Sequence, residues 1–155
     1  MARPSFHVHY LIFCTSVEYP DVHRPQRNST LNGVDFVLEV PPGTEFPFVP
    51  DEFWLFARLY SRSDRTGILP PLSVTCVWLD SPNGHATDIW THDLPRISFN
   101  KTHAVIDRGW VFRNTETENK FLFPGLGRYE FRLWHSMTRW PNMRVKAREY
   151  ILLES

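Results

Sequence analysis

The sequence lacks the local motifs by which many enzymes and metal proteins are recognised. Its 155 residues include two cysteines, which by themselves cannot supply the four ligands of a structural zinc site. There is no Gly-rich loop that would cradle a phosphate, no Gly-x-Ser-x-Gly elbow and no His-Glu-x-x-His pair. These absences argue against the enzyme classes with such signatures, so we predict a noncatalytic protein without a cofactor.

Charge and hydropathy argue against two further classes. Seventeen basic residues balance seventeen acidic ones, so the net charge provides no attraction to nucleic acid or to an anionic membrane. No stretch approaches the roughly 20 apolar residues that a membrane-spanning helix requires. The N-terminal residues 1–7 also lack the apolar run of a signal peptide. We therefore expect a cytoplasmic protein with no nucleic-acid or membrane partner.

The two cysteines, Cys14 and Cys76, each lie within an alternating apolar run. Buried free cysteines behave as small hydrophobic residues, and a reducing compartment disfavours disulfides. We therefore expect two free thiols that point into the core. Their wide separation along the chain would also suit a bridge between two packed sheets, and this alternative stays open.

Aromatic residues, at 15%, and prolines, of which there are thirteen, are abundant. Apolar and polar residues alternate at period two between turn residues, a pattern typical of β-strands. Asn83-Gly84 is a strong hairpin signal, since both residues tolerate the positive φ angles of a tight turn. We predict one domain, residues 1–155, with an all-β fold: a two-sheet antiparallel β-sandwich of immunoglobulin-like type. About nine strands are expected, over residues 6–14, 31–40, 53–61, 72–80, 86–92, 96–99, 105–113, 127–135 and 145–153.

The most informative stretch is residues 123–133, where a Pro-Gly turn leads directly into an alternating strand. In immunoglobulin-like sandwiches, a tyrosine near the start of the penultimate strand ties a turn to the core, two residues before an inward position. Tyr129 and Phe131 fit these two places. We therefore expect both to face the core, and the alternate residues Glu130 and Arg132 to face outward.

Four stretches together resemble an uncharacterised family of bacterial β-sandwich proteins. They are an apolar first strand, a Leu-x-Gly second strand, an aromatic strand after a proline-rich crossing, and a Pro-Gly-x-Gly-x-Tyr-x-Phe penultimate strand. In this chain they correspond to residues 11–14, 31–34, 53–60 and 124–133. The resemblance implies an immunoglobulin-like sandwich with no known activity, and it assigns no functional residues. An immunoglobulin domain proper would carry cysteine in place of Phe131.

The outward positions of three strands predict a binding surface. If residues 53–61, 127–135 and 145–153 are neighbours in one sheet, as strands C, F and G are in immunoglobulin-like sandwiches, their outward side chains share one face. Arg and aromatic side chains are over-represented where protein partners anchor, so we expect this face to bind a protein partner or a second copy of the chain. An equal alternative is a ladder that only stabilises neighbouring strands, or a loop laid over the face, for instance around Trp140. The predicted binding residues are Trp54, Arg58, Tyr60, Arg132, Trp134, Arg148 and Tyr150.

Two alternatives belong to other functional classes. His7 and His9 are two residues apart on one predicted strand, so their imidazoles could converge on a metal, with His135 or the His92-Asp93 pair as further ligands. Two ligands do not make a site, so the simpler interpretation is a partly exposed strand near the terminus. The third class is a carbohydrate-binding module that stacks sugars on the tryptophans of the predicted face.

Overall fold

The computed structural model describes residues 6–18, 30–34, 36–61, 67–68, 71–99, 105–135 and 145–155. The strands are β1 (Phe6–Cys14), β2 (Ser16–Glu18), β3 (Thr30–Asn32), β4 (Val37–Glu39), β5 (Glu52–Ser61), β6 (Gly67–Ile68), β7 (Leu72–Trp78), β8 (Thr87–Asp93), β9 (Ser98–Phe99), β10 (Val105–Arg113), β11 (Gly127–His135) and β12 (Val145–Glu154). Every regular element in the described part of the chain is therefore a strand, which confirms the all-β prediction. Within the same residues, no helix has the length and apolarity needed to cross a bilayer.

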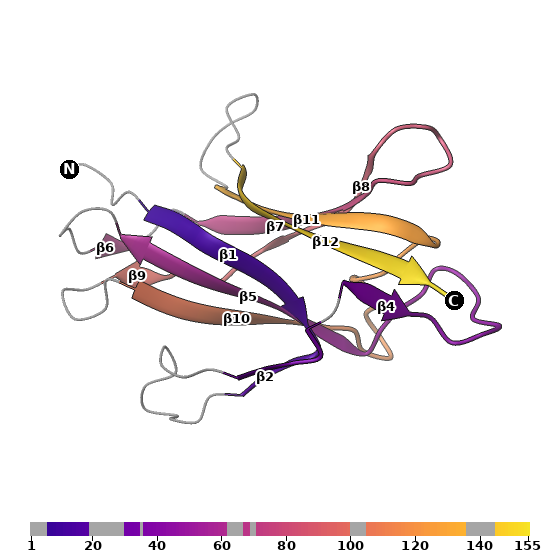
Figure 1. Cartoon of the computed structure of the whole chain (residues 1–155), viewed down its shortest axis with the longest axis horizontal. Helices are drawn as coiled ribbons and strands as arrows, with labels where there is room; N and C mark the ends of the chain where they lie inside the picture. The colour runs from indigo at the N-terminus through magenta and orange to yellow at the C-terminus, as the bar shows by residue number, and fades with distance from the viewer. Residues whose placement is uncertain are drawn as a thin grey trace.

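The strands form two main sheets packed face to face (Figure 1). One sheet has three strands in the order β1-β5-β10, and the other has five in the order β4-β12-β11-β7-β8. Neighbouring strands are antiparallel except β4 and β12, which run parallel. Two short pairs, β2-β3 and β6-β9, lie outside the main sheets. The predicted two-sheet sandwich is thus confirmed.

Aromatic rings from both sheets build the core. Phe13 of β1 and Phe53 of β5 stack with their ring centroids 5.5 Å apart, and each lies 5.8 Å from Phe131 of β11 in the other sheet. Trp90 of β8 and Phe112 of β10 extend the cluster across the same gap, at 5.7 Å. Such pairs contribute about 0.5–1.5 kcal/mol beyond the area they bury. Much of the aromatic content therefore serves to hold the sheets together.

A β-bulge in β1 changes which of its side chains face the core. The pairing of β1 with β5 shifts between Val8 and Tyr10, so His9 is the extra residue. After the bulge, Phe13 belongs to the core cluster, whereas Cys14 lies outside it. The expectation that Cys14 points into the core is therefore wrong, because strict alternation does not survive the inserted residue.

Both thiols are nevertheless free and buried, as expected. Cys14 is fully covered on the outer side of its sheet, and burial raises the pKa of its thiol to about 11. Cys76 belongs to the core, where burial raises the pKa of its thiol well above its ordinary value. Neither group is a reactive thiolate at neutral pH.

The strand predicted over residues 31–40 is replaced by two separate short strands. Gly33 has a φ of +63°, and a Cβ there would lie 2.1 Å from Oγ1 of Thr15, so only glycine fits this bend. Before the bend, β3 pairs with β2, and after it β4 pairs with β12. The break therefore sends the two halves of the predicted strand to different sheets.

The predicted tyrosine corner is present. The hydroxyl of Tyr129 donates a hydrogen bond of 2.7 Å to the carbonyl oxygen of Gly125 and accepts one of 3.2 Å from its amide. Trp78 stacks on the Tyr129 ring at 5.9 Å, and a Cβ on Gly125 would come within 2.7 Å of the indole. Burial raises the pKa of Tyr129 far above its ordinary value. The corner thus fixes which side of β11 faces the core.

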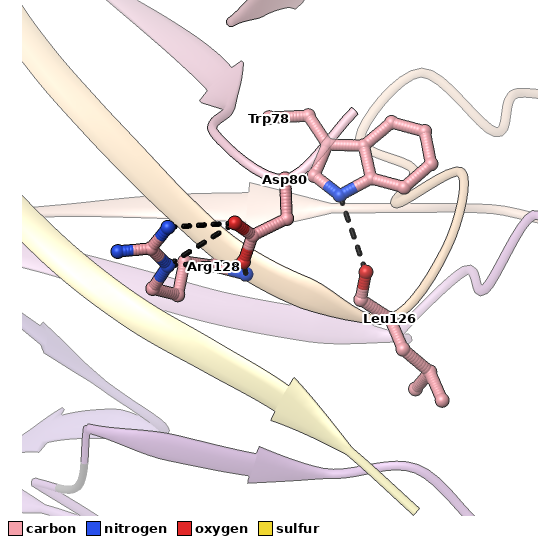
Figure 2. Close-up of polar contacts among 4 residues, drawn as sticks. All are labelled: Trp78, Asp80, Leu126 and Arg128. Atoms are coloured by element: carbon pink, nitrogen blue, oxygen red, sulfur yellow. Dashed lines mark hydrogen bonds and ion pairs between the residues drawn. The ribbon is translucent and has the colours of Figure 1, made fainter. Parts of the chain in front are cut away.

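An ion pair between Asp80 and Arg128 lies beside the same turn (Figure 2). The carboxylate of Asp80 accepts hydrogen bonds from Nε, Nη2 and the backbone amide of Arg128, the shortest at 2.7 Å. The side-chain and backbone hydrogen bonds from Arg128 lower the pKa of Asp80 to about 2. On the other side of the turn, Nε1 of Trp78 donates to the carbonyl of Leu126 at 3.2 Å. These contacts tie β7 to the beginning of β11.

We predict that Tyr129→Phe lowers the free energy of unfolding by about 1 kcal/mol or more, because it removes the buried hydroxyl and leaves the Gly125 carbonyl without its partner. Chemical denaturation followed by tryptophan fluorescence measures this loss. Tyr60→Phe is the matched control, since the Tyr60 hydroxyl has no hydrogen bond within the described residues. An unchanged midpoint for Tyr129→Phe would show that the corner hydrogen bonds do not stabilise the fold.

Candidate binding surface

The seven predicted binding residues lie on two opposite faces of the sandwich. β5 lies between β1 and β10, whereas β11 and β12 belong to the other sheet (Figure 1). The expectation that these three strands share a sheet is wrong. Residues 31–40 are divided at Gly33 and form no long second strand, so β5 is the next long strand after β1 and pairs with it. The two resulting surfaces are the β5 face, with Trp54, Arg58 and Tyr60, and the β11–β12 face, with Arg132, Trp134, Arg148 and Tyr150.

On the β5 face, the arginines and the Trp54 indole are paired with carboxylates of the same sheet. Nε and Nη2 of Arg58 donate to the two carboxylate oxygens of Asp107, at 2.7 and 3.0 Å, and the guanidinium lies 5.5 Å from the ring centre of Tyr10. Nε1 of Trp54 donates to Glu52 at 2.9 Å. The other carboxylate oxygen of Glu52 accepts a 2.8 Å hydrogen bond from Arg113. This face matches the cross-strand ladder that was the alternative to a binding surface.

The third β5-face residue, Tyr60, packs against both histidines of the metal hypothesis. The His7 ring stacks on Tyr60 at 5.1 Å, and the His9 ring lies edge-on at 6.5 Å. No group of three or more His, Cys, Asp or Glu side chains within the described residues is placed to hold a metal ion. The His135 side chain lies outside those residues, and Nδ1 of His92 is 3.2 Å from Nζ of Lys120. The contacts of His7 and His9 are therefore aromatic.

The β11–β12 face is organised around a buried carboxylate. Glu130 points outward from β11 as expected, yet its side chain is only 7% exposed. Nε of Arg132 donates to its Oε1, the Tyr150 hydroxyl donates to the same carboxylate, and Nε of Arg148 lies 3.7 Å from Oε1. Burial alone would raise the pKa of Glu130, but the hydrogen bonds from Arg132 and Tyr150 and the two guanidinium charges outweigh it and lower that pKa. Glu130 is therefore ionised at neutral pH.

One carboxylate serves two guanidinium groups on this face. Arg132 takes the direct hydrogen bond, so Arg148 has only the 3.7 Å ion pair within the described residues. Its side chain is 52% exposed, and a guanidinium carries five N–H donors. Tyr150, beside it on β12, is 49% exposed. Arg148 thus has both charge and donors that a partner would meet.

The middle of the face is polar, but its hydrogen bonds are satisfied internally. Nε1 of Trp134 donates to Oγ1 of Thr75 at 2.9 Å, and Thr75 shares a 2.9 Å hydrogen bond with Thr91 of β8. Oγ of Ser73 donates to Oδ1 of Asp93 at 2.6 Å. The face therefore runs from exposed arginine on β12, through satisfied hydroxyl groups on β7, to exposed carboxylate on β8.

The alternation of the sequence predicts the direction of these side chains but not their partners. Alternation placed Glu130 outward without showing that side chains from the neighbouring strand bury it. Asp88 and Asp93, near the two ends of β8, form an acidic margin of the face that alternation alone does not predict. Their place on this face depends on the register between β7 and β8, which the sequence alone does not give.

An open hollow lies where the loop before β5 meets the loop after β10. Asn114, Thr115, Glu116 and Asp51 are among its lining residues. The Asn114 amide donates to the carbonyls of Pro50 and Phe121, at 2.7 and 2.9 Å, and accepts from the Phe121 amide. Asn114 therefore shapes its own loop.

No family model and no curated protein matches the sequence. Among solved structures, the chain is similar to Pseudomonas fluorescens alkylpurine DNA glycosylase AlkC, determined with DNA containing an abasic site analogue. The identity is 12% and the TM-score 0.50, over 98% of this chain and 31% of that one. It is also similar to a β-glucosidase involved in saponin metabolism from intestinal bacteria, at 8% identity and TM-score 0.54, over 99% of this chain and 17% of that one. At these identities the likeness shows the fold alone, and the chain spans less than a third of either protein.

We predict that Glu130→Gln lowers the free energy of unfolding at pH 7 by about 1–2 kcal/mol, because two guanidinium groups lose their shared counter-charge. The lowered pKa of Glu130 makes its ionised form stabilising above the unfolded-state pKa, near 4.3, and that contribution disappears as pH falls. Wild type and variant should therefore converge at low pH. Denaturation midpoints at several pH values measure this, with the exposed Glu45→Gln as control. An equal gap at every pH would contradict the role of the charge.

Proposed function

We propose that this chain is a noncatalytic protein-binding module that contacts its partner through the β11–β12 face. Arg148 is the observation that carries the proposal: it is half exposed, and its 3.7 Å ion pair leaves most of its donors unpaired within the described residues. Arginine and tyrosine are among the residue types that dominate binding energy at protein interfaces. Arg148 and Tyr150 provide both types side by side.

Preorganisation supports the same choice of face. Glu130 holds Arg132 and Tyr150 from one side, so these side chains lose little conformational entropy when a partner docks. Among the described residues, the arginines of the β5 face give direct hydrogen bonds to carboxylates, Arg58 two to Asp107 and Arg113 one to Glu52, whereas Arg148 gives none. We therefore assign the β5 face a stabilising role and the β11–β12 face the binding role.

Two further points fit a binding module. The two similar solved structures are longer chains in which the matching part is a minor share, and at this identity their activities are not assigned to this chain. We place the module in the cytoplasm, as the sequence predicts, and the two unbridged thiols support that compartment.

Site-specific photo-crosslinking in the host cell tests the proposal. A photoreactive residue at position 150 should form protein adducts, because that side chain would lie in the contact. The same residue at position 60, on the β5 face, should form none, and Arg148→Ser should remove the adducts at position 150. Adducts at position 60 alone, or adducts at 150 that ignore Arg148→Ser, would contradict the proposed face.

A further inference from the structure

We infer that the partner is a second copy of this chain, docked face to face through the β11–β12 face about a two-fold axis parallel to the strands. This inference rests on the proposed function and names the partner. Its starting point is the separation of charge across the five-stranded sheet, in a chain whose basic and acidic residues are equal in number.

The two charged margins of the face lie too far apart to neutralise each other. Arg148 lies on β12, and the exposed residues Asp88 and Asp93 lie on β8, with β11 and β7 between them. Three steps of about 4.8 Å place these strands about 14 Å apart. The Debye length at physiological ionic strength is about 8 Å, so the margins interact weakly within one copy.

The strand register places the opposite charges at matching heights. Arg148 pairs with Arg132, which pairs with Thr75, and Thr75 pairs with Thr91. Asp88 and Asp93 occupy the rows on either side of Thr91 along β8. A guanidinium brought onto Thr91 would therefore have an outward carboxylate on each side, about 7 Å along the strand in either direction.

A two-fold axis parallel to the strands produces this match twice. Rotation about such an axis, placed over β11 and β7, sets β12 of one copy on β8 of the other at the same height. Arg148 of each copy then lies between Asp88 and Asp93 of the other. An axis across the strands would instead bring β12 onto β12 and β8 onto β8, so Arg148 would not meet the acidic residues of β8. At the height of Arg148, such an axis would set Arg148 against its own symmetry mate, and like charges facing each other oppose docking. Two-fold dimers are also the commonest oligomers of soluble proteins.

The centre of the face tolerates burial. The polar atoms of Trp134, Thr75 and Ser73 already have hydrogen-bond partners within the sheet, so covering them leaves few unsatisfied groups. Trp134 and Tyr150 add aromatic surface to the contact. Packed sheets lie about 10 Å apart with nearly aligned strands, a spacing that the long arginine side chains can bridge.

A charge exchange between two variants tests the inference by sedimentation velocity of the purified full chain. Wild type should be a dimer whose dissociation constant rises with salt. Arg148→Glu should raise that constant at least about tenfold, because it sets like charges together. The double variant Asp88→Lys, Asp93→Lys should be equally weakened. Mixing the two variants should restore a heterodimer, since every contact is again between opposite charges.

A control variant and a replacement for the double variant separate loss of the contact from loss of the fold. Arg113→Glu, a charge reversal at an exposed position of the other sheet, should leave the dimer intact. Thermal melts confirm that each variant is folded, and if the double variant unfolds through loss of the Ser73 hydrogen bond, Asp88→Lys alone replaces it. A wild type that stays monomeric, or a dimer that neither variant weakens, would overturn the inference. If wild type is monomeric but position 150 forms Arg148-dependent adducts to another protein, the proposed function stands and only the dimer is ruled out. If there is neither a dimer nor such an adduct, the proposed function is ruled out as well.

Discussion

The tyrosine corner is the constraint from which the arrangement of the candidate surface follows. Because the Tyr129 hydroxyl is hydrogen-bonded to both backbone groups of Gly125, the beginning of β11 has one permitted orientation. Alternation then directs Phe131 into the aromatic core and Glu130 outward. The position of the buried carboxylate, and with it the arginines of the neighbouring strand, is thus set by a contact on the opposite side of the sheet.

The buried carboxylate makes the β11–β12 face different from an ordinary sheet surface. Glu130 is covered by side chains that project from its own strand and from β12, and their charges keep it ionised. Arg132 is held by this contact, and Arg148 is left half exposed. On the other sheet, Asp107 receives both hydrogen bonds of a single arginine, so that pair is closed. Both faces contain arginine, tryptophan and tyrosine, but they differ in whether each arginine has a carboxylate of its own.

Period two predicted the fold class, the bounds of several strands and the tyrosine corner, because these depend on local pattern. Strand order depends on which runs become strands, and residues 31–40 read as one strand until the left-handed φ of Gly33 divides them. With no long strand there, β5 is the next long strand after β1 and pairs with it, in the opposite sheet from β11 and β12, so the predicted site is split. The bulge at His9 carries no glycine or proline to mark it, and so the inward side of β1 was misassigned. The burial of Glu130 depends on side chains of the neighbouring strand β12, and the sequence alone does not show which strands are neighbours.

Hydroxyl-radical footprinting is the most direct test of the central claim that the β11–β12 face is a contact surface. The oxidation rates of Trp134, Tyr150 and Tyr60 are compared between intact cells and dilute purified protein. The account predicts that Trp134 and Tyr150 are protected in cells relative to Tyr60, whose exposure is set within its own sheet. Equal rates in both settings at Trp134 and Tyr150, or protection confined to Tyr60, would contradict it.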